Sequence, residues 1–187
     1  MADRPYHHGD LRRALVVAAV DELKESGAAG LSLREVARRV GVSHAAPTHH
    51  FGDKAGLLTA VAAEGFGLLA DALAAAWERT HDFLEVGIAY VEFAVSHPAH
   101  FEVMFRSELL HADDADLQAA RARSRAQLYG PITPRGKDPR VDAGVAAWAL
   151  MHGVASLWLD GALPRQAGKT PRAVAQAAGR YLSLPTR

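Results

Sequence analysis

Residues 32–54, with the sequence SLREVARRVGVSHAAPTHHFGDK, decide the fold. Ser32 and Glu35 have the spacing of a capping box, in which each side chain satisfies a free amide at a helix start. Apolar residues then recur at helical spacing. Gly41 can adopt the positive φ that ends a helix, and Ser43 can cap the next one. The segment therefore predicts two short helices joined by a tight turn, the helix-turn-helix pattern, whose second helix enters the DNA major groove.

The rest of the sequence predicts further helices, so we expect an all-α protein. Alanine and leucine dominate, and no run alternates apolar and polar residues as a strand would. The further helices are expected over residues 9–26, 54–79, 82–96, 98–110, 113–129, 139–159 and 171–184. We interpret Gly65 and Gly67 as a place where a neighbouring helix approaches closely, with a hinge as the alternative. Three prolines and two glycines predict a loop at 130–139.

Composition limits the classes of protein to consider. The chain has 187 residues, enough for one or two domains, and its formal net charge is zero. It has no cysteine, which excludes disulfides and thiolate metal sites and fits a cytoplasmic protein. No segment is apolar enough for long enough to predict a membrane span, and the first residues do not form a signal peptide. Residues 32–54 contain four basic and two acidic residues, so we expect a modest electrostatic attraction to DNA.

The run from Ala18 to Leu58 resembles the DNA-binding domain of tetracycline-repressor-type (TetR/AcrR) transcriptional regulators. AAVDELKESGAAGLSLREVARRVGVS and the later HHFGDKAGLL follow that family's pattern almost residue for residue. A second resemblance, at Trp148-Ala-Leu-Met-His152-Gly153, is to the Trp-His-Gly signature of one C-terminal domain type in the family. Together they imply a three-helix DNA-binding domain over residues 1–54 and a helical effector-binding and dimerisation domain over 55–187.

The resemblance also implies which residues meet DNA, by position in the family's motif. Those implied at base edges are His44, Ala45 and Ala46. Those implied near phosphates are Ser43, Thr48, His49 and Lys54, with Arg34 on the preceding helix as a further candidate. Imidazole can donate to guanine acceptors and alanine can contact thymine methyl groups, so the chemistry fits. The alternative is an ordinary solvated face. We also expect the arm over residues 4–8 to reach the DNA backbone.

Two residues depart from the family's pattern. Thr48 stands where tyrosine is usual, so the usual phosphate contact is expected either to be lost or to pass to His49. Pro47 lacks an amide hydrogen and should shorten or tighten the first turn of the second helix. Neither change argues against DNA binding, but both affect which atoms make the contacts.

A largely apolar effector pocket is implied for the C-terminal domain, because members of the family usually enclose one there. The candidate pocket residues are Phe66, Tyr90, Phe93, Phe101, Met104, Phe105, Trp148 and His152. A packed core without a pocket is the alternative, because large apolar residues are mostly buried for packing alone.

Other kinds of site have little support. Ten histidines raise the question of a metal site, but no convergent set of ligands is visible around pairs such as His97 and His100. We expect no metal and no cofactor. His152 and Ser156 lack the nucleophile elbow and oxyanion loop that an esterase-like enzyme would need, so we expect no catalysis.

The sequence therefore predicts a cytoplasmic, ligand-responsive transcriptional regulator, a repressor that binds a palindromic double-stranded DNA operator. It is expected to be a homodimer joined through residues 139–159 and 171–184. The alternative is a helical small-molecule-binding protein whose DNA-binding function has decayed, which Pro47, Thr48 and the neutral net charge favour.

Overall fold

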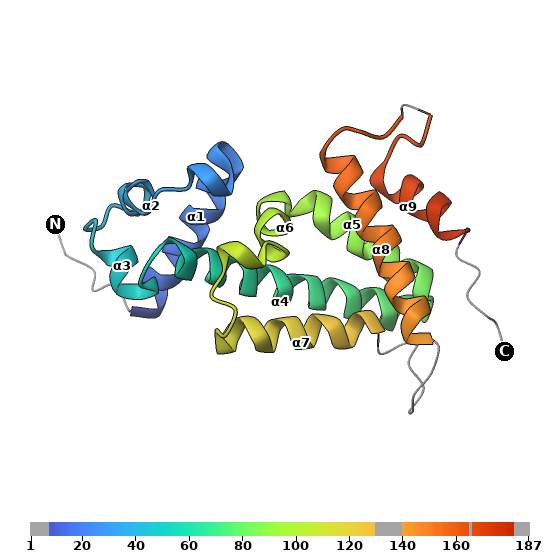
Figure 1. Ribbon diagram of the computed structural model, residues 1–187, viewed down its shortest axis with the longest axis horizontal. Coiled ribbons are helices and arrows are strands. Elements are labelled where there is room, and N and C mark those ends of the chain that lie inside the picture. Colours follow the sequence, from blue (N-terminus) through green and yellow to red (C-terminus); the bar gives the residue numbers. More distant parts are fainter. Residues whose placement is uncertain (1–7, 130–139, 165, 182–187) are drawn as a thin grey trace. The chain divides into compact units, whose positions relative to one another are not determined.

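The structure is a computed structural model that describes residues 8–129, 140–164 and 166–181. The regular elements in those ranges are all helical, as expected (Figure 1). They are α1 (His8–Gly30), α2 (Leu33–Val40), α3 (Ala46–Phe51), α4 (Lys54–Thr80), α5 (Phe83–Ser96), α6 (Pro98–Met104), the 3-10 turn η1 (Ser107–Leu109), α7 (Ala115–Tyr129), α8 (Arg140–Leu159) and α9 (Pro171–Gly179). Most of the predicted DNA-reaching arm, the predicted loop at 130–139 and the predicted end of the last helix lie outside the described residues.

The chain packs into two compact units. The N-terminal unit comprises residues 1–65 and 99–118, and the C-terminal unit comprises 66–98 and 119–187. This division follows packing, so the predicted functional boundary between residues 54 and 55 stays a prediction. The segment that contains α6 and η1 belongs to the N-terminal unit although it follows α5 in the sequence.

A glycine interrupts the first helix of the N-terminal unit. Gly27 has φ 66° and ψ 175°, so the regular helix is broken there, as expected, and α1 resumes after the kink as a short helical piece up to Gly30. The kink takes the next amide out of the regular helical pattern, and the amide of Ala28 donates instead to Oε1 of Glu102 at 2.9 Å. This bond joins α6 to α1 within one unit.

The predicted turn after α2 is confirmed, but the predicted capping box is wrong. Gly41 takes the left-handed conformation at φ 77° and closes the helix through bonds to the last carbonyls. Ser32 occupies the N-cap position without a side-chain bond. Glu35 instead accepts two hydrogen bonds from Arg38, at 2.8 and 2.5 Å. The bidentate pair with Arg38 therefore occupies the carboxylate that the capping box would have used.

The glycines in α4 differ in their surroundings. A Cβ at Gly65 would lie 2.7 Å from Sδ of Met104 and 3.0 Å from Cβ of His100, which confirms the predicted close helix approach. A Cβ at Gly67 would meet nothing within 4 Å. The close approach therefore explains Gly65 alone.

The length and composition of α4 contradict our expectation that no segment could span a membrane. By these measures α4 is long and apolar enough to cross a bilayer. More than half of its most apolar stretch, 56 %, is buried inside the protein, as in the central helix of a helical core. The apolar character of α4 is thus accounted for by packing.

The C-terminal unit is built around three helices, α5, α8 and α9, that pack against one another (Figure 1). Asp82 caps α5 by accepting the amide of Leu84, and Thr170 caps α9 by accepting the amide of Ala173. These caps confirm the predicted starts of both helices. The largest fully buried side chains of this unit are Leu69, Leu73, Val86, Ile88 and Tyr90.

Candidate DNA-binding surface and effector pocket

A shared arginine fixes the helix-turn-helix against α1. The guanidinium of Arg39 donates two hydrogen bonds to Glu25, at 3.0 and 2.5 Å. The same group lies 2.8 Å from Oε2 of Glu22 and 3.5 Å from Oε1 of Glu35. The bonds from Arg39 hold the pKa of Glu25 below its usual value, and the pKa of Arg39 is raised in return. One cation among three carboxylates therefore holds α2 at a fixed position on α1.

The second helix of the motif begins later than Ser43 predicted. The amide of Ala45 donates to Oγ of Ser43 at 3.2 Å, and the amide of Ala46 donates to the carbonyl of Ser43 at 2.9 Å, so these residues form a turn. The helix starts at Ala46 with Pro47 buried in its first turn. Because proline has no amide to donate, it fits only near a helix start, which leaves α3 six residues long.

The residues predicted to meet DNA all lie at the surface of the N-terminal unit. The exposed ones are Arg34, Ser43, His44, Ala45, Thr48 and His49, and the half-buried ones are Ala46 and Lys54. They come from α2, the turn, α3 and the start of α4. This arrangement leaves polar and small side chains available on one contiguous stretch of chain, and their contacts with DNA stay predictions.

Lys54 has a contact that sequence reasoning missed. Its Nζ donates to the carbonyl of Ala29, in the last turn of α1, at 2.8 Å. A cation is favourable at a helix C-terminus, where carbonyl groups carry partial negative charge. An ammonium group has three protons, so this bond leaves donors for a phosphate. Lys54 thus fastens α4 to α1 as well as being a candidate for the DNA surface.

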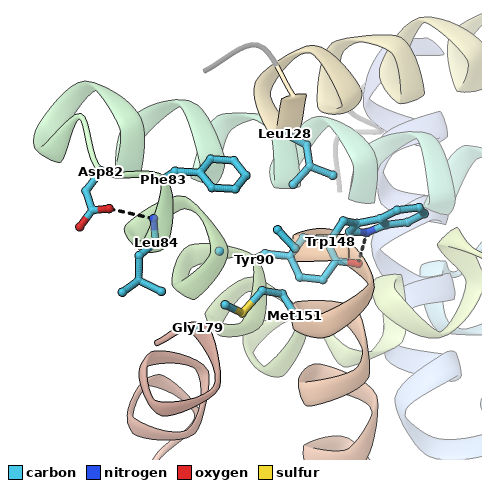
Figure 2. Close-up of a pocket in the computed structure, with 10 residues that line it drawn as sticks. Asp82, Phe83, Leu84, Tyr90, Leu128, Trp148, Met151 and Gly179 are labelled. Atoms are coloured by element: carbon cyan, nitrogen blue, oxygen red, sulfur yellow. Dashed lines mark hydrogen bonds between the residues drawn. The ribbon is translucent and has the colours of Figure 1, made fainter. Parts of the chain in front are cut away.

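The C-terminal unit contains a mainly apolar pocket of about 140 Å³ (Figure 2). Its larger lining side chains are Phe83, Leu84, Tyr90, Leu128, Trp148 and Met151. They come from α5, α7 and α8, and Gly179 of α9 completes the wall. The pocket is therefore assembled from four helices that are distant in sequence.

A hydrogen-bond network joins two pocket residues to a histidine. Nε1 of Trp148 donates to the hydroxyl of Tyr90 at 3.3 Å, and that hydroxyl lies 2.8 Å from Nδ1 of His152. Burial lowers the pKa of His152 and raises that of Tyr90, so both are neutral near pH 7. Indole can only donate, so Tyr90 accepts from Trp148 and its own proton is available to Nδ1 of neutral His152.

The structure brings three of the eight predicted pocket residues together, namely Tyr90, Trp148 and His152. Phe66 is buried beneath the guanidinium of Arg121, and Phe93 stacks on His97 with ring centroids 4.8 Å apart. The remaining three, Phe101, Met104 and Phe105, belong to the N-terminal unit, where Phe101 and Phe105 contact each other edge to face.

Sequence reasoning missed most of the lining. The predicted pocket residues did not include Phe83, Leu84, Leu128 or Met151, all of which line the pocket. A Cβ at either Gly87 or Gly179 would lie 3.1 Å from the methyl group of Met151, so the flexible methionine side chain fits between α5 and α9 where both helices carry glycine. The sequence contains no signal for this, because the three residues are far apart in the chain.

Among the residues that the structure describes, no three His, Asp or Glu side chains gather as metal ligands would. The described residues form an exposed helix-turn-helix in the N-terminal unit and an apolar pocket in the C-terminal unit. They define a ligand-responsive, DNA-binding transcriptional regulator.

The chain belongs to the TetR family of bacterial regulators. Residues 15–61 match the family model "Bacterial regulatory proteins, tetR family". Residues 83–180 match the model "Tetracyclin repressor-like, C-terminal domain". Proteins of this family are transcriptional regulators and generally not enzymes.

Similar proteins agree with this assignment over nearly the whole chain. The HTH-type transcriptional regulator BetI 2 of Chromohalobacter salexigens is 31% identical over 183 residues, which cover 92% of this chain and 84% of that protein. A solved protein of unknown function from Rhodococcus sp. RHA1 is 34% identical, with a TM-score of 0.79 and coverage of 96% and 97%. LfrR from Mycobacterium smegmatis, solved with proflavine, shares the fold at 20% identity, with a TM-score of 0.65 and coverage of 94% and 98%.

Proposed function

We propose that the protein is a cytoplasmic repressor that binds a palindromic DNA operator as a homodimer and releases it when a small, largely apolar effector binds. The observation that supports this proposal is that one chain contains both sites. The N-terminal unit presents an exposed helix-turn-helix, and the C-terminal unit encloses an apolar pocket with a neutral polar network at its wall.

DNA reading rests on the exposed side chains of the helix-turn-helix. His44 and Ala45 precede α3, where they would enter the major groove first, and Arg34 and His49 flank them with groups that can donate to phosphates. Fixing α2 to α1 through Arg39 supports this role, because a reading helix must hold its register on the duplex.

Dimerisation rests on an exposed apolar stripe along α8. Val145, Ala149, Gly153 and Leu157 recur every four residues, and Val145 and Leu157 are 45% and 46% exposed. A Cβ at Gly153 would meet nothing within 4 Å, so a partner helix could approach closely there. A dimer would place two reading helices in successive major grooves, about 34 Å apart, as one chain cannot.

Effector binding rests on the pocket between α5, α7, α8 and α9. LfrR was solved with proflavine, and another protein of the same fold, the multidrug binding protein EbrR, with imidazole. By analogy, this chain also binds a small molecule, and the pocket of the C-terminal unit is the place that we propose for it. Such a ligand releases DNA if it binds a conformation whose reading helices do not fit the operator.

The test is a binding titration with DNA from the region upstream of the protein's own gene. We expect salt-sensitive binding by the wild type. The double variant Arg34→Ala, Lys54→Ala should weaken binding to all sequences and flatten the salt dependence by about 2 per protomer in log–log slope. The matched control Lys24→Ala, Arg106→Ala removes the same charge outside the motif and should bind nearly as the wild type does.

Two outcomes would contradict the proposal. If the first double variant keeps wild-type affinity, the DNA surface is assigned to the wrong residues. If the wild type binds ligands but no DNA, the protein is the alternative considered above, a ligand-binding protein whose DNA function has decayed.

A further inference from the structure

The pocket's size limits the body of the ligand. A volume of about 140 Å³ is close to the roughly 150 Å³ of an engineered apolar cavity that admits benzene. Phe83, Tyr90 and Trp148 supply aromatic surface around this space (Figure 2). A single ring or a body of that size therefore fits the pocket as it stands, and the flexible side chain of Met151 could give a little more room.

One charged side chain lines the pocket. Asp82 is exposed, and it lies at the opposite end of the lining group from Tyr90 and Trp148 (Figure 2). Its Oδ1 accepts the amide of Leu84 at 2.9 Å, which caps α5. Within the described part of the chain, no Lys or Arg lies within ion-pair distance of Asp82, and Oδ2 has no hydrogen bond. The carboxylate thus keeps acceptor sites for a ligand after it has capped the helix.

The arginine on the neighbouring α9 does not pair with Asp82. Arg172 donates to both carboxylate oxygens of Glu85 at 2.8 Å and to Glu92 at 3.4 Å. These two acids lie on α5, the helix that Asp82 caps. The guanidinium is thus engaged by two other carboxylates, and Asp82 is the one charged residue among the described residues that line the pocket.

We propose that the effector is an organic cation with a compact apolar body, and that Asp82 selects it by receiving its ammonium-type head at the pocket mouth. This inference rests on the proposed function of the pocket as the effector site. The body would fill the space between Phe83 and Trp148. The ring of Phe83, which is next to Asp82 in the sequence, can attract a cation in addition to the carboxylate, since the ring quadrupole presents negative charge on its face.

The test compares three ligands of one size that differ in charge: benzylammonium, benzyl alcohol and benzoate. Binding to the full-length protein is followed by tryptophan fluorescence, into millimolar concentrations because fragments this small bind weakly. For the wild type we expect benzylammonium to bind about tenfold more tightly than benzyl alcohol, and benzoate more weakly than either.

Asp82→Asn is the decisive variant, because asparagine keeps an acceptor for the helix cap and removes only the charge. This variant should weaken the binding of benzylammonium about tenfold and leave the binding of benzyl alcohol unchanged. Ala147→Leu, which adds bulk to the lining, is the control and should weaken all three ligands. Circular dichroism checks that both variants fold.

The outcomes separate the two proposals. If benzylammonium and benzyl alcohol bind the wild type equally, or Asp82→Asn weakens both alike, selection by Asp82 is wrong and the pocket's role stands. If none of the three ligands binds the wild type, or Ala147→Leu binds them unchanged, the pocket is not the ligand site and both proposals fail.

Discussion

The two compact units are stabilised by different interactions. In the N-terminal unit, a charged network centred on Arg39 holds the DNA-reading helices, and its members are partly exposed. In the C-terminal unit, apolar packing surrounds a neutral network of Tyr90, Trp148 and His152. Charged networks weaken with salt and acid, whereas buried neutral networks respond to lost hydrogen bonds and to forced protonation. The two functions can therefore be disturbed separately.

The largest effect should come from the exposed stripe of α8. Leu157→Arg places a charge in the proposed dimer interface, where a desolvated, unpaired charge is costly. We expect a monomer by light scattering and at least a hundredfold loss of operator affinity, since one half-site contributes too little. Because the residue is 46% exposed in the single chain, the fold itself should be retained. Light scattering that shows wild-type protein as a monomer at micromolar concentration would refute the dimer.

Arg39→Met should disturb the N-terminal unit alone. It leaves Glu22, Glu25 and Glu35 without their shared cation, so like charges repel between α1 and α2. We expect operator affinity to fall about tenfold and the melting temperature to drop, while ligand binding in the C-terminal unit is unchanged. A variant that loses ligand and DNA binding equally would show that the units are not separable.

Acid should also act on this network. The pKa of Glu25 is lowered in the folded protein by Arg39, so its contribution to stability is present above the unfolded pKa and is lost as pH falls through the folded one. In the wild type, the free energy of unfolding should decline below about pH 4, and Arg39→Met should make that decline smaller. Part of it should remain, because Glu35 and Asp53 also have lowered pKa values, from Arg38 and from the amide of Gly56 respectively. A pH titration of thermal stability on both proteins measures it.

Tyr90→Phe should disturb the C-terminal unit by a smaller amount. It removes the partner of both Trp148 and His152, which costs about 1–2 kcal/mol in the free energy of unfolding. Since burial lowers the pKa of His152, the neutral form is favoured in the folded state, and stability is lost as pH falls below about 6.5. Chemical denaturation at pH 7.5 and 5.5 tests this. If Tyr90→Phe leaves the free energy of unfolding unchanged and stability does not fall between pH 7.5 and 5.5, the network contributes nothing to stability.

The smallest effects come from the two glycines of α4. Gly67→Ala should stabilise the protein by up to about 1 kcal/mol, because alanine is the better helix former and nothing crowds its Cβ. Gly65→Ala brings the same propensity gain but forces Met104 and His100 aside, and overpacking costs about 1–3 kcal/mol. We expect the two variants to change the free energy of unfolding in opposite directions, which denaturation curves of the two proteins measure. Equal shifts for the two variants would remove the close-approach explanation of Gly65.

The helix-turn-helix was predictable because its signals are local. Gly41 ends α2 as expected, and α4 begins at Lys54, the predicted start of that helix, where the amide of Gly56 donates to Asp53 at 2.8 Å. The errors arose where a residue had a stronger partner or a stricter constraint. Glu35 bonds to arginines rather than to a helix end, and Pro47 allows α3 to begin only just before it. Which partner a side chain bonds, and where a helix starts, depends on the three-dimensional structure and cannot be inferred from the local sequence pattern.

The pocket could not be predicted in the same way. Its lining comes from four helices, and apolar spacing alone does not distinguish Phe83, which lines the pocket, from Phe93, which packs on His97. The Trp148–His152 signature pointed to the right region, but the partner that connects the two is Tyr90, 58 residues before Trp148. Long-range pairing of this kind requires the tertiary structure.

In the proposed complex, α3 of each of two chains reads one half of an operator. Chemical footprinting of the wild type on its upstream DNA measures this. We expect two protected half-sites on one face of the duplex, with centres about 34 Å or a multiple of that apart. With His44→Ala, base preference should relax at one position in each half-site while the spacing stays the same. Protection of a single half-site, or protection without a preferred sequence, would show that two chains do not read one operator.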